Sequence, residues 1–280
     1  MSPILIRRLP DNLCNFLTFS RYHAKSAMTL ILLLAASSLL AGFIDAVVGG
    51  GGLIQIPAML ILLPGAPVAT ILGTNKFASC AGTTMAVQRY ARHVAIDWST
   101  VLPAAITAFV FSFLGSRTVT LLNTAFMRPI VLVLLVLVAI YVFFVKDLGR
   151  IHQPRHAPKK ATWLGVLIGA GLGFYDGFFG PGTGSFLIFL FVGVFGFDFL
   201  SASASAKVIN WATNIASVIY FAWSGNIIYQ YAAPMAVCNV LGATIGTRLA
   251  LAKGSRFVRI FFLVIVCALI AKLAQSIIAR

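Results

Sequence analysis

The feature that most constrains the fold is an apolar run from Met28 to Leu63, in which Asp45 is the only charged residue. As one helix, this run would extend about 54 Å, whereas the hydrocarbon core of a membrane is only about 30 Å thick. The helix must therefore break, and the chain can do so at four consecutive glycines: Gly49, Gly50, Gly51 and Gly52. The piece that follows, residues 53–63, ends at the turn sequence PGAP, so we expect a short helix that enters the membrane without clearly crossing it.

The composition places this run in a membrane protein. Of the 280 residues, 60% are hydrophobic and only 10% are charged, whereas about 25% of a soluble domain is charged. We therefore predict an all-α polytopic membrane protein with about eight transmembrane helices, some of them glycine-broken or re-entrant. The formal net charge of +15 suits basic loops that face the negatively charged inner leaflet of the lipid bilayer.

Several classes of partner are not expected from this sequence. The chain has no basic helix and no soluble domain that would bind a nucleic acid. Its four cysteines and four histidines form no cluster with metal-ligand spacing, and no nucleotide-binding motif occurs. We therefore expect no cofactor, no metal and no catalytic residue. The expected partners are a small anionic substrate and the lipid bilayer, and a homo-oligomer is left open.

The chain divides into four segments. Residues 1–27 are basic and could form a short helix on the membrane surface. Residues 28–145 and 161–280 are two apolar transmembrane segments, and the first should contain helices near 70–92, 99–121 and 127–145. A basic loop at residues 146–160, with the sequence KDLGRIHQPRHAPKK, separates them.

The second apolar segment repeats the first at a constant offset, which places Gly42 on Gly173. From Gly42 the chain reads GFIDAVVGGG, and from Gly173 it reads GFYDGFFGPG. Without a gap, Lys76 falls on Lys207, and one proline and two arginines also stay in register. Apolar composition produces chance matches among Leu, Val and Ala, but not a series of rare polar residues in register. We therefore predict two duplicated halves.

The duplication leaves two topologies open. If the short helix after each glycine tract is re-entrant, each half crosses the membrane four times and the halves run parallel. If that helix crosses, each half crosses five times and the halves are inverted. The basic N-terminal segment and the basic central loop are both expected in the cytoplasm, which requires an even number of crossings between them. We therefore expect parallel halves, although the basic residues around Lys253 disagree with this orientation.

The glycine tracts are candidate anion sites. Irregular backbone is tolerated in a membrane only against protein or a polar cavity. A broken helix also presents free N–H groups and the positive end of its dipole, both of which attract anions. Close packing of helices through small residues is the alternative, but a tract beside an aspartate in both halves favours a cavity. The predicted site therefore includes residues 49–52 together with Gly180 and Gly182.

Two lysines are the sharpest polar feature of the apolar segments. Lys76 and Lys207 are each the only charge in a long stretch, and an ammonium inside a membrane costs at least about 2.5–3.5 kcal/mol. Snorkelling to the membrane surface is the alternative, but hydroxyl and amide side chains surround both lysines. We expect both lysines to face one cavity and to bind a small anion together with these neighbours: Thr74, Asn75, Ser79, Asn210 and Asn214.

Asp45 and Asp176 are the only acids deep in apolar sequence. They could pair with the lysines, cap a short helix or carry a proton that is coupled to transport. Two membrane aspartates can also form a protease dyad, but no GxGD motif accompanies them and a protease would leave both lysines unexplained. We therefore expect a carrier in which both aspartates serve coupling, with an anion channel as the alternative.

The chain resembles the TauE/SafE sulfite-exporter family of membrane permeases. The resemblance covers about residues 30–275 and is carried by GFIDAVVGGGGLIQIP, LGTNKFASCAGTTMAVQRYARHVAIDW, GFYDGFFGPGTGSFL and AKVINWATNIASVIYF. It implies a secondary carrier for sulfite, sulfoacetate or other organosulfonates, in a multi-pass protein of the bacterial inner membrane. The second half has Ala206 where the first has Asn75, so the two half-sites are not equal.

Overall fold

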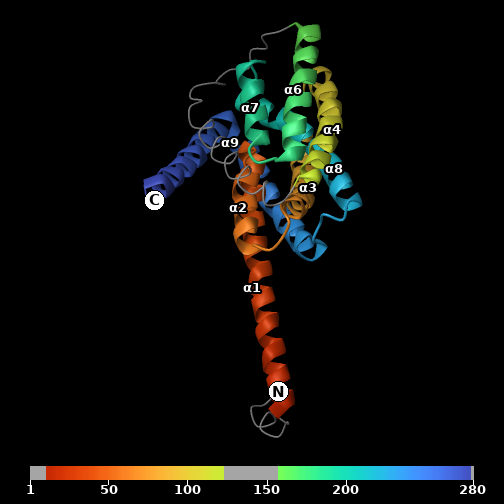
Figure 1. Cartoon of the computed structure of the whole chain (residues 1–280). Helices are drawn as coiled ribbons and strands as arrows, with labels where there is room; N and C mark the ends of the chain where they lie inside the picture. Colours follow the sequence, from red (N-terminus) through yellow and green to blue (C-terminus); the bar gives the residue numbers. More distant parts are fainter. Residues whose placement is uncertain (1–10, 123–156, 279–280) are drawn as a thin grey trace.

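The structure is a computed structural model that describes residues 11–122 and 157–278, with side chains for residues 28–122 and for most of 157–260. The predicted helix at 127–145 and most of the basic loop lie outside these residues, as do residues 1–10. Every element in the described ranges is a helix (Figure 1). The helices are α1 (Asp11–Val48), α2 (Gly52–Leu62), α3 (Val68–His93), α4 (Trp98–Leu121), α6 (Pro158–Phe178), α7 (Thr183–Gly193), α8 (Phe199–Trp223) and α9 (Tyr229–Ile278).

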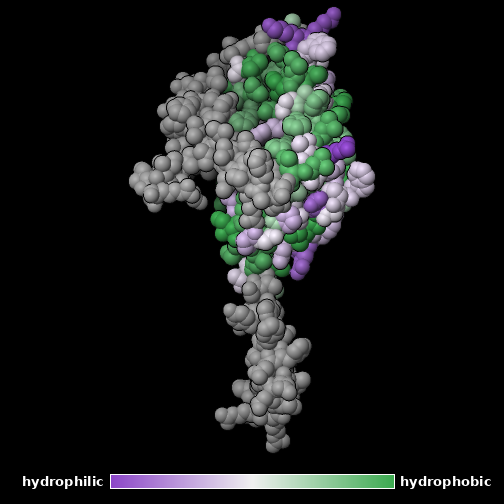
Figure 2. Space-filling model, viewed as in Figure 1, coloured by the Kyte–Doolittle hydropathy of each residue, from purple (hydrophilic) through white to green (hydrophobic). Residues whose placement is uncertain are grey.

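The outer surface of these helices is apolar. Large hydrophobic side chains such as Leu32, Ile106 and Val237 are exposed, and Figure 2 shows apolar residues over much of the described surface. Such a surface is stable against lipid tails rather than water, so the fold is an all-α membrane protein. Three stretches within the described helices are long and apolar enough to cross a membrane: Met28–Val48, Trp98–Leu121 and Tyr229–Gly254.

One helix is longer than the sequence predicted, and another is kinked. α1 is continuous from Asp11, so residues 11–27 extend the first helix instead of forming a separate helix on the membrane surface. α9 consists of two helices joined at a kink, because Gly254 has φ 69° and ψ −170°, outside the helical region.

Both glycine tracts interrupt helices. α1 gives way to α2 across residues 49–51, and α6 gives way to α7 across residues 179–182. Gly49 begins the first break and Gly180 lies in the second, with φ of 79° and 94°, a left-handed conformation that residues with a Cβ rarely adopt. Glycine at these two positions therefore lets each helix stop abruptly inside the bundle.

Helix starts recur at the offset of the sequence repeat. α2 and α7 each contain 11 residues and start at Gly52 and Thr183, two positions that the repeat aligns. The starts of α3 and α8 are separated by the same offset, and so are those of α4 and α9. These are the positions at which two copies of one helical unit would begin.

Helices of the two halves pack against each other. α1 packs along α9 and α6 along α4, while α3 contacts α9 and α8 contacts α4. Glycine permits the close approach, since a Cβ at Gly42 would overlap the backbone of Asn239 and one at Gly173 would overlap that of Ala108. The largest apolar core lies between these interleaved helices and includes residues of α1, α3, α7 and α8.

Figure 1 shows α1 and α6 running in opposite directions. α1 rises from the N terminus at the bottom of the view, whereas α6 descends from its start at the top. This arrangement corrects the expectation of parallel halves. That expectation placed the starts of α1 and α6 on one side of the membrane, but the two starts lie at opposite ends of the molecule.

Candidate functional site

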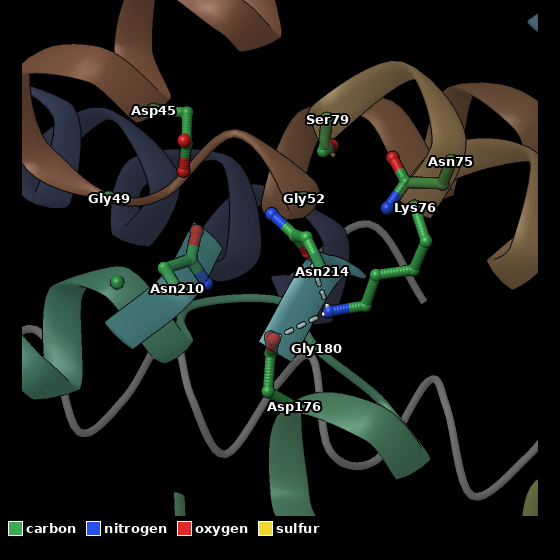
Figure 3. A pocket seen from close by; sticks show the side chains of 11 residues that line it. Asp45, Gly49, Gly52, Asn75, Lys76, Ser79, Asp176, Gly180, Asn210 and Asn214 are labelled. Carbon is green, nitrogen blue, oxygen red and sulfur yellow. Dashed lines mark hydrogen bonds and ion pairs between the residues drawn. The ribbon is translucent and has the colours of Figure 1, made fainter. Parts of the chain in front are cut away.

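A small cavity lies where the two helix breaks meet (Figure 3). Its walls come from α1, α3, α6 and α8 and from the first turns of α2 and α7. The residues that line it are Asp45, Gly49, Gly52, Asn75, Lys76, Ser79, Asp176, Gly180, Gly184, Asn210 and Asn214. Ten of these eleven residues were predicted from the sequence to belong to one site.

Each lysine pairs with the aspartate of the other half. Lys76 Nζ lies 2.7 Å from Asp176 Oδ2, and Lys207 Nζ lies 2.7 Å from Asp45 Oδ2. The sequence repeat aligns the two lysines with each other and the two aspartates with each other, so the two ion pairs occupy equivalent places. Of the three roles considered for the aspartates, pairing with the lysines is therefore the one that the geometry displays.

The two ion pairs differ in hydrogen bonding. Lys207 donates a hydrogen bond to Asp45 Oδ2. Asp176 Oδ2, by contrast, accepts no hydrogen bond from any residue that the structure describes, so its contact with Lys76 is an ion pair without hydrogen-bond geometry. The Lys76 ammonium instead donates to Asn214 Oδ1 at 3.1 Å, as Figure 3 shows.

Burial makes these charges expensive and explains the pairing. The side chains of Lys76 and Asp176 are 5% and 1% exposed, and that of Lys207 is fully buried. Neither lysine extends to the membrane surface, so snorkelling does not describe them. A buried charge that loses its partner is strongly destabilising. Because each lysine pairs with an aspartate of the other half, the two ion pairs hold the halves together.

Amide and hydroxyl groups complete the polar wall. Asn214 bridges the halves, because it accepts from Lys76 and donates through Nδ2 to Thr83 Oγ1 at 3.3 Å. Asn75 Oδ1 is buried and has no hydrogen-bond partner among the described residues. Buried polar groups are nearly always hydrogen-bonded, so an unused oxygen in a cavity wall indicates capacity for water or a ligand.

The two short helices direct their N-terminal ends at the cavity. Gly52 and Gly184 lie in the first turns of α2 and α7, and both line it. Carbonyls of the two breaks accept hydrogen bonds from several first-turn N–H groups, among them those of Leu53, Ile54 and Thr183. The helix dipole still adds partial positive charge at these ends. Gly180 brings the backbone close to the ion pair, since a Cβ at this position would lie 3.2 Å from Lys76 Nζ. These features favour an anion.

The cavity is small in this conformation. About 20 Å³ is open to the centre of a water molecule, which is room for roughly one water. An oxyanion of four or more heavy atoms would need more space. Movement of the Asp176 or Lys76 side chain would provide this space, and would also separate the two charges of their ion pair.

Five predicted residues do not line the cavity. Gly51 packs against α1, where a Cβ would lie 2.7 Å from Asp45 Cβ. Thr74 connects α3 to the start of α9, because its hydroxyl donates to Thr70 O and accepts from Ile228 N. The remaining three are Gly50, Gly182 and Lys207.

The sequence prediction missed Gly184 as a wall residue. Gly184 belongs to the second glycine tract and packs against the backbone of Gly49. A Cβ at either glycine would overlap the other, so the two helix breaks are in direct contact. The aligned residue in the first half is Leu53, which is why comparison of the two halves gave no signal for this position.

Known proteins resemble the chain over most of its length. The sequence model of the family described as "Sulfite exporter TauE/SafE" matches residues 34–273. A probable membrane transporter protein of Sinorhizobium is 35% identical over 248 residues, which are 88% of this chain and 93% of the relative. A probable membrane transporter protein of Haemophilus influenzae is 34% identical over 247 residues, covering 88% of this chain and 95% of the relative. No solved structure matches the chain.

Proposed function

The chain belongs to the TauE/SafE sulfite exporter family of membrane transporters, and from this premise we propose that it is a secondary carrier of a small oxyanion. The substrate class is sulfite or an organosulfonate, and the binding site is the cavity at the two helix breaks. The protein is a multi-pass component of a bacterial inner membrane, and it catalyses no covalent reaction.

The observation that carries the proposal is the position of Lys76. Its ammonium reaches the cavity between the N-terminal ends of α2 and α7, where it contacts Asp176 and Asn214. A sulfite or sulfonate oxygen can take the place of the Asp176 carboxylate as the partner of this cation. Hydrogen bonds between charged groups are shorter and stronger than neutral ones, which suits selective capture of an oxyanion.

The aspartates provide a way to couple the anion to protons. In the resting arrangement two lysines and two aspartates balance in charge. If Asp176 takes up a proton, Lys76 keeps its charge and gains an anion as its partner, so that proton and anion move together. The neighbouring phenols do not bind these carboxylates, because Tyr175 donates its hydroxyl hydrogen to Pro181 O and Tyr90 donates its own to Ala46 O.

A carrier fits the cavity better than the alternatives do. The cavity has room for about one water, whereas a channel needs a continuous water-filled path. In a protease dyad two carboxylates share one proton, but here Asp45 and Asp176 are each paired with an ammonium.

Transport by the purified protein in proteoliposomes tests the proposal. We expect uptake of sulfite, or of one of a panel of small sulfonates, to rise when a proton gradient is imposed and to saturate with anion concentration. Vesicles without protein are the control for leakage. Absence of uptake for the whole panel would refute an anion carrier, and non-saturating flux much above about 10³ ions per second would identify a channel, since carriers change conformation in μs–ms steps.

A further inference from the structure

The two equivalent ion pairs meet the cavity differently. Lys76 and Asp176 both line the cavity. Of the other pair only Asp45 lines it, with a side chain that is 18% exposed, while the side chain of Lys207 is completely buried behind it. The cavity therefore presents one ammonium and two carboxylates to whatever enters it.

The neighbours of the two lysines also differ, and the more polar surroundings are those of Lys76. Lys76 has the amides of Asn75 and Asn214 beside it at the cavity, and its ion pair has no hydrogen-bond geometry. At the place equivalent to Asn75 the second half has Ala206, which is buried and offers no polar group. Lys207 is bound to Asp45 by a direct hydrogen bond. Of the two lysines, only Lys76 therefore lines the cavity with amide side chains beside it, one from each half.

A fully buried ammonium cannot touch an anion, but it can determine what the anion meets. Without Lys207, the Asp45 carboxylate would present an uncompensated negative charge at the cavity wall. Like charges close together in a medium of low dielectric constant repel strongly, so the anion would be excluded. With Lys207 in place, at 2.7 Å, the pair is neutral as seen from the cavity.

Building on the proposed function, we infer that the two lysines have different tasks: Lys76 binds the anion directly, whereas Lys207 is a positioning residue that neutralises Asp45 at the cavity wall. The duplicated pair is then used asymmetrically, with the ligand contact in one copy and charge compensation in the other.

A charge-balanced pair of double variants tests this inference. Lys207→Met/Asp45→Asn and Lys76→Met/Asp176→Asn each remove one cation and one anion at equivalent positions, so neither leaves an unpaired buried charge. Binding of sulfite to the purified full-length protein in nanodiscs is measured by calorimetry, with melting temperature as the check of folding. A second neutral pair, Lys207→Gln/Asp45→Asn, covers the case in which methionine packs poorly.

We expect the Lys76 double variant to bind sulfite about ten- to hundredfold more weakly than the parent, and the Lys207 double variant to lose clearly less affinity than that. In folded Lys207→Met protein sulfite should bind weakly, and adding Asp45→Asn should restore binding. A purely structural role would instead change the melting temperature and leave the affinity of the folded protein unchanged. Equal losses in both folded double variants would show that Lys207 contacts the anion and would overturn the inference while the carrier stands. A parent that binds and transports none of the anions would refute the carrier itself, and the inference with it.

Discussion

Lys76 is the residue at which the stability of the protein and its proposed function meet. It is the single cation that both lines the cavity and is held by an aspartate from the other half, among the residues that the structure describes. The same contact that stabilises the resting bundle must loosen when an anion binds. The free energy of the ion pair is therefore the cost that binding of the anion, or protonation of Asp176, has to offset.

Loss of the Lys76 charge should destabilise the protein through its partner. Lys76→Met leaves Asp176 buried and unpaired, which should lower the free energy of unfolding by about 3–5 kcal/mol. The second change Asp176→Asn removes the unpaired charge, so most of the stability should return. Thermal unfolding of the detergent-purified variants measures both effects, with the exposed Lys159→Met as the control. If the single and double variants melt alike, the ion pair does not stabilise the folded state.

Gly180 should be intolerant of a side chain for two reasons. Its φ of 94° disfavours any residue with a Cβ by about 1–2 kcal/mol, and that Cβ would lie 3.2 Å from Lys76 Nζ and 3.3 Å from Asp176 Oδ1. Gly180→Ala should therefore weaken both stability and sulfite binding. Gly171→Ala in α6 is the matched control, since a Cβ there meets nothing within 4 Å and should be neutral or slightly stabilising. Equal behaviour of the two variants would contradict this account of the helix break.

At the scale of the helices, the sequence predicted the ends of helices better than the contacts between them. The tract at residues 49–52 identified the first break because an apolar run of that length cannot be one helix. Lys76 and Asp176 were both assigned to the site, but their pairing was only one of several options. Local patterns report the face and the ends of a helix, whereas the partner of a side chain depends on packing between distant segments.

The start of α4 provides a test of helix capping with a defined dependence on pH. Asp97 accepts hydrogen bonds from Ser99 N at 3.2 Å and from Thr100 Oγ1 at 2.8 Å. Partial burial by itself would raise the pKa of Asp97, but these hydrogen bonds outweigh it and hold the pKa below its ordinary value. Since the pKa is lower in the folded state, the stabilisation is complete above the unfolded value of about 3.9 and is lost as the pH falls through the folded value.

Asp97→Ala should lower the free energy of unfolding at neutral pH by about 0.5–2 kcal/mol, towards the lower end because the carboxylate is exposed. The difference from the parent should shrink below about pH 3.9. Asp97→Asn is the matched control, because asparagine caps a helix about as well as aspartate but does not titrate. Melting curves across the pH range distinguish the three proteins. An Asp97→Ala difference that persists unchanged in acid would mean that the ionised cap is not its source.

At the scale of the whole molecule, the relative direction of the halves is the part that sequence reasoning predicted wrongly. The constant offset in the sequence agrees with the spacing of helix starts, which follow it in the pairs α2 and α7, α3 and α8, and α4 and α9. The direction was inferred from basic residues before α1 and around residues 146–160, and charge counts in loops are only a bias on orientation. The relative direction of the halves depends on how many segments of each half cross the membrane. One short helix after each glycine tract is enough to change that number from even to odd.

Inverted halves make a prediction about which side of the membrane two equivalent residues face. The sequence repeat aligns Met28, near the start of the apolar part of α1, with Lys159 at the start of α6, and both are exposed. In a variant without the four native cysteines, Met28→Cys and Lys159→Cys are introduced singly and treated with a membrane-impermeant maleimide, in intact spheroplasts and in inside-out vesicles. Because α1 and α6 run in opposite directions, one cysteine should react only in spheroplasts and the other only in vesicles. If both cysteines react from the same side, α1 and α6 enter the membrane from one face and the halves are parallel.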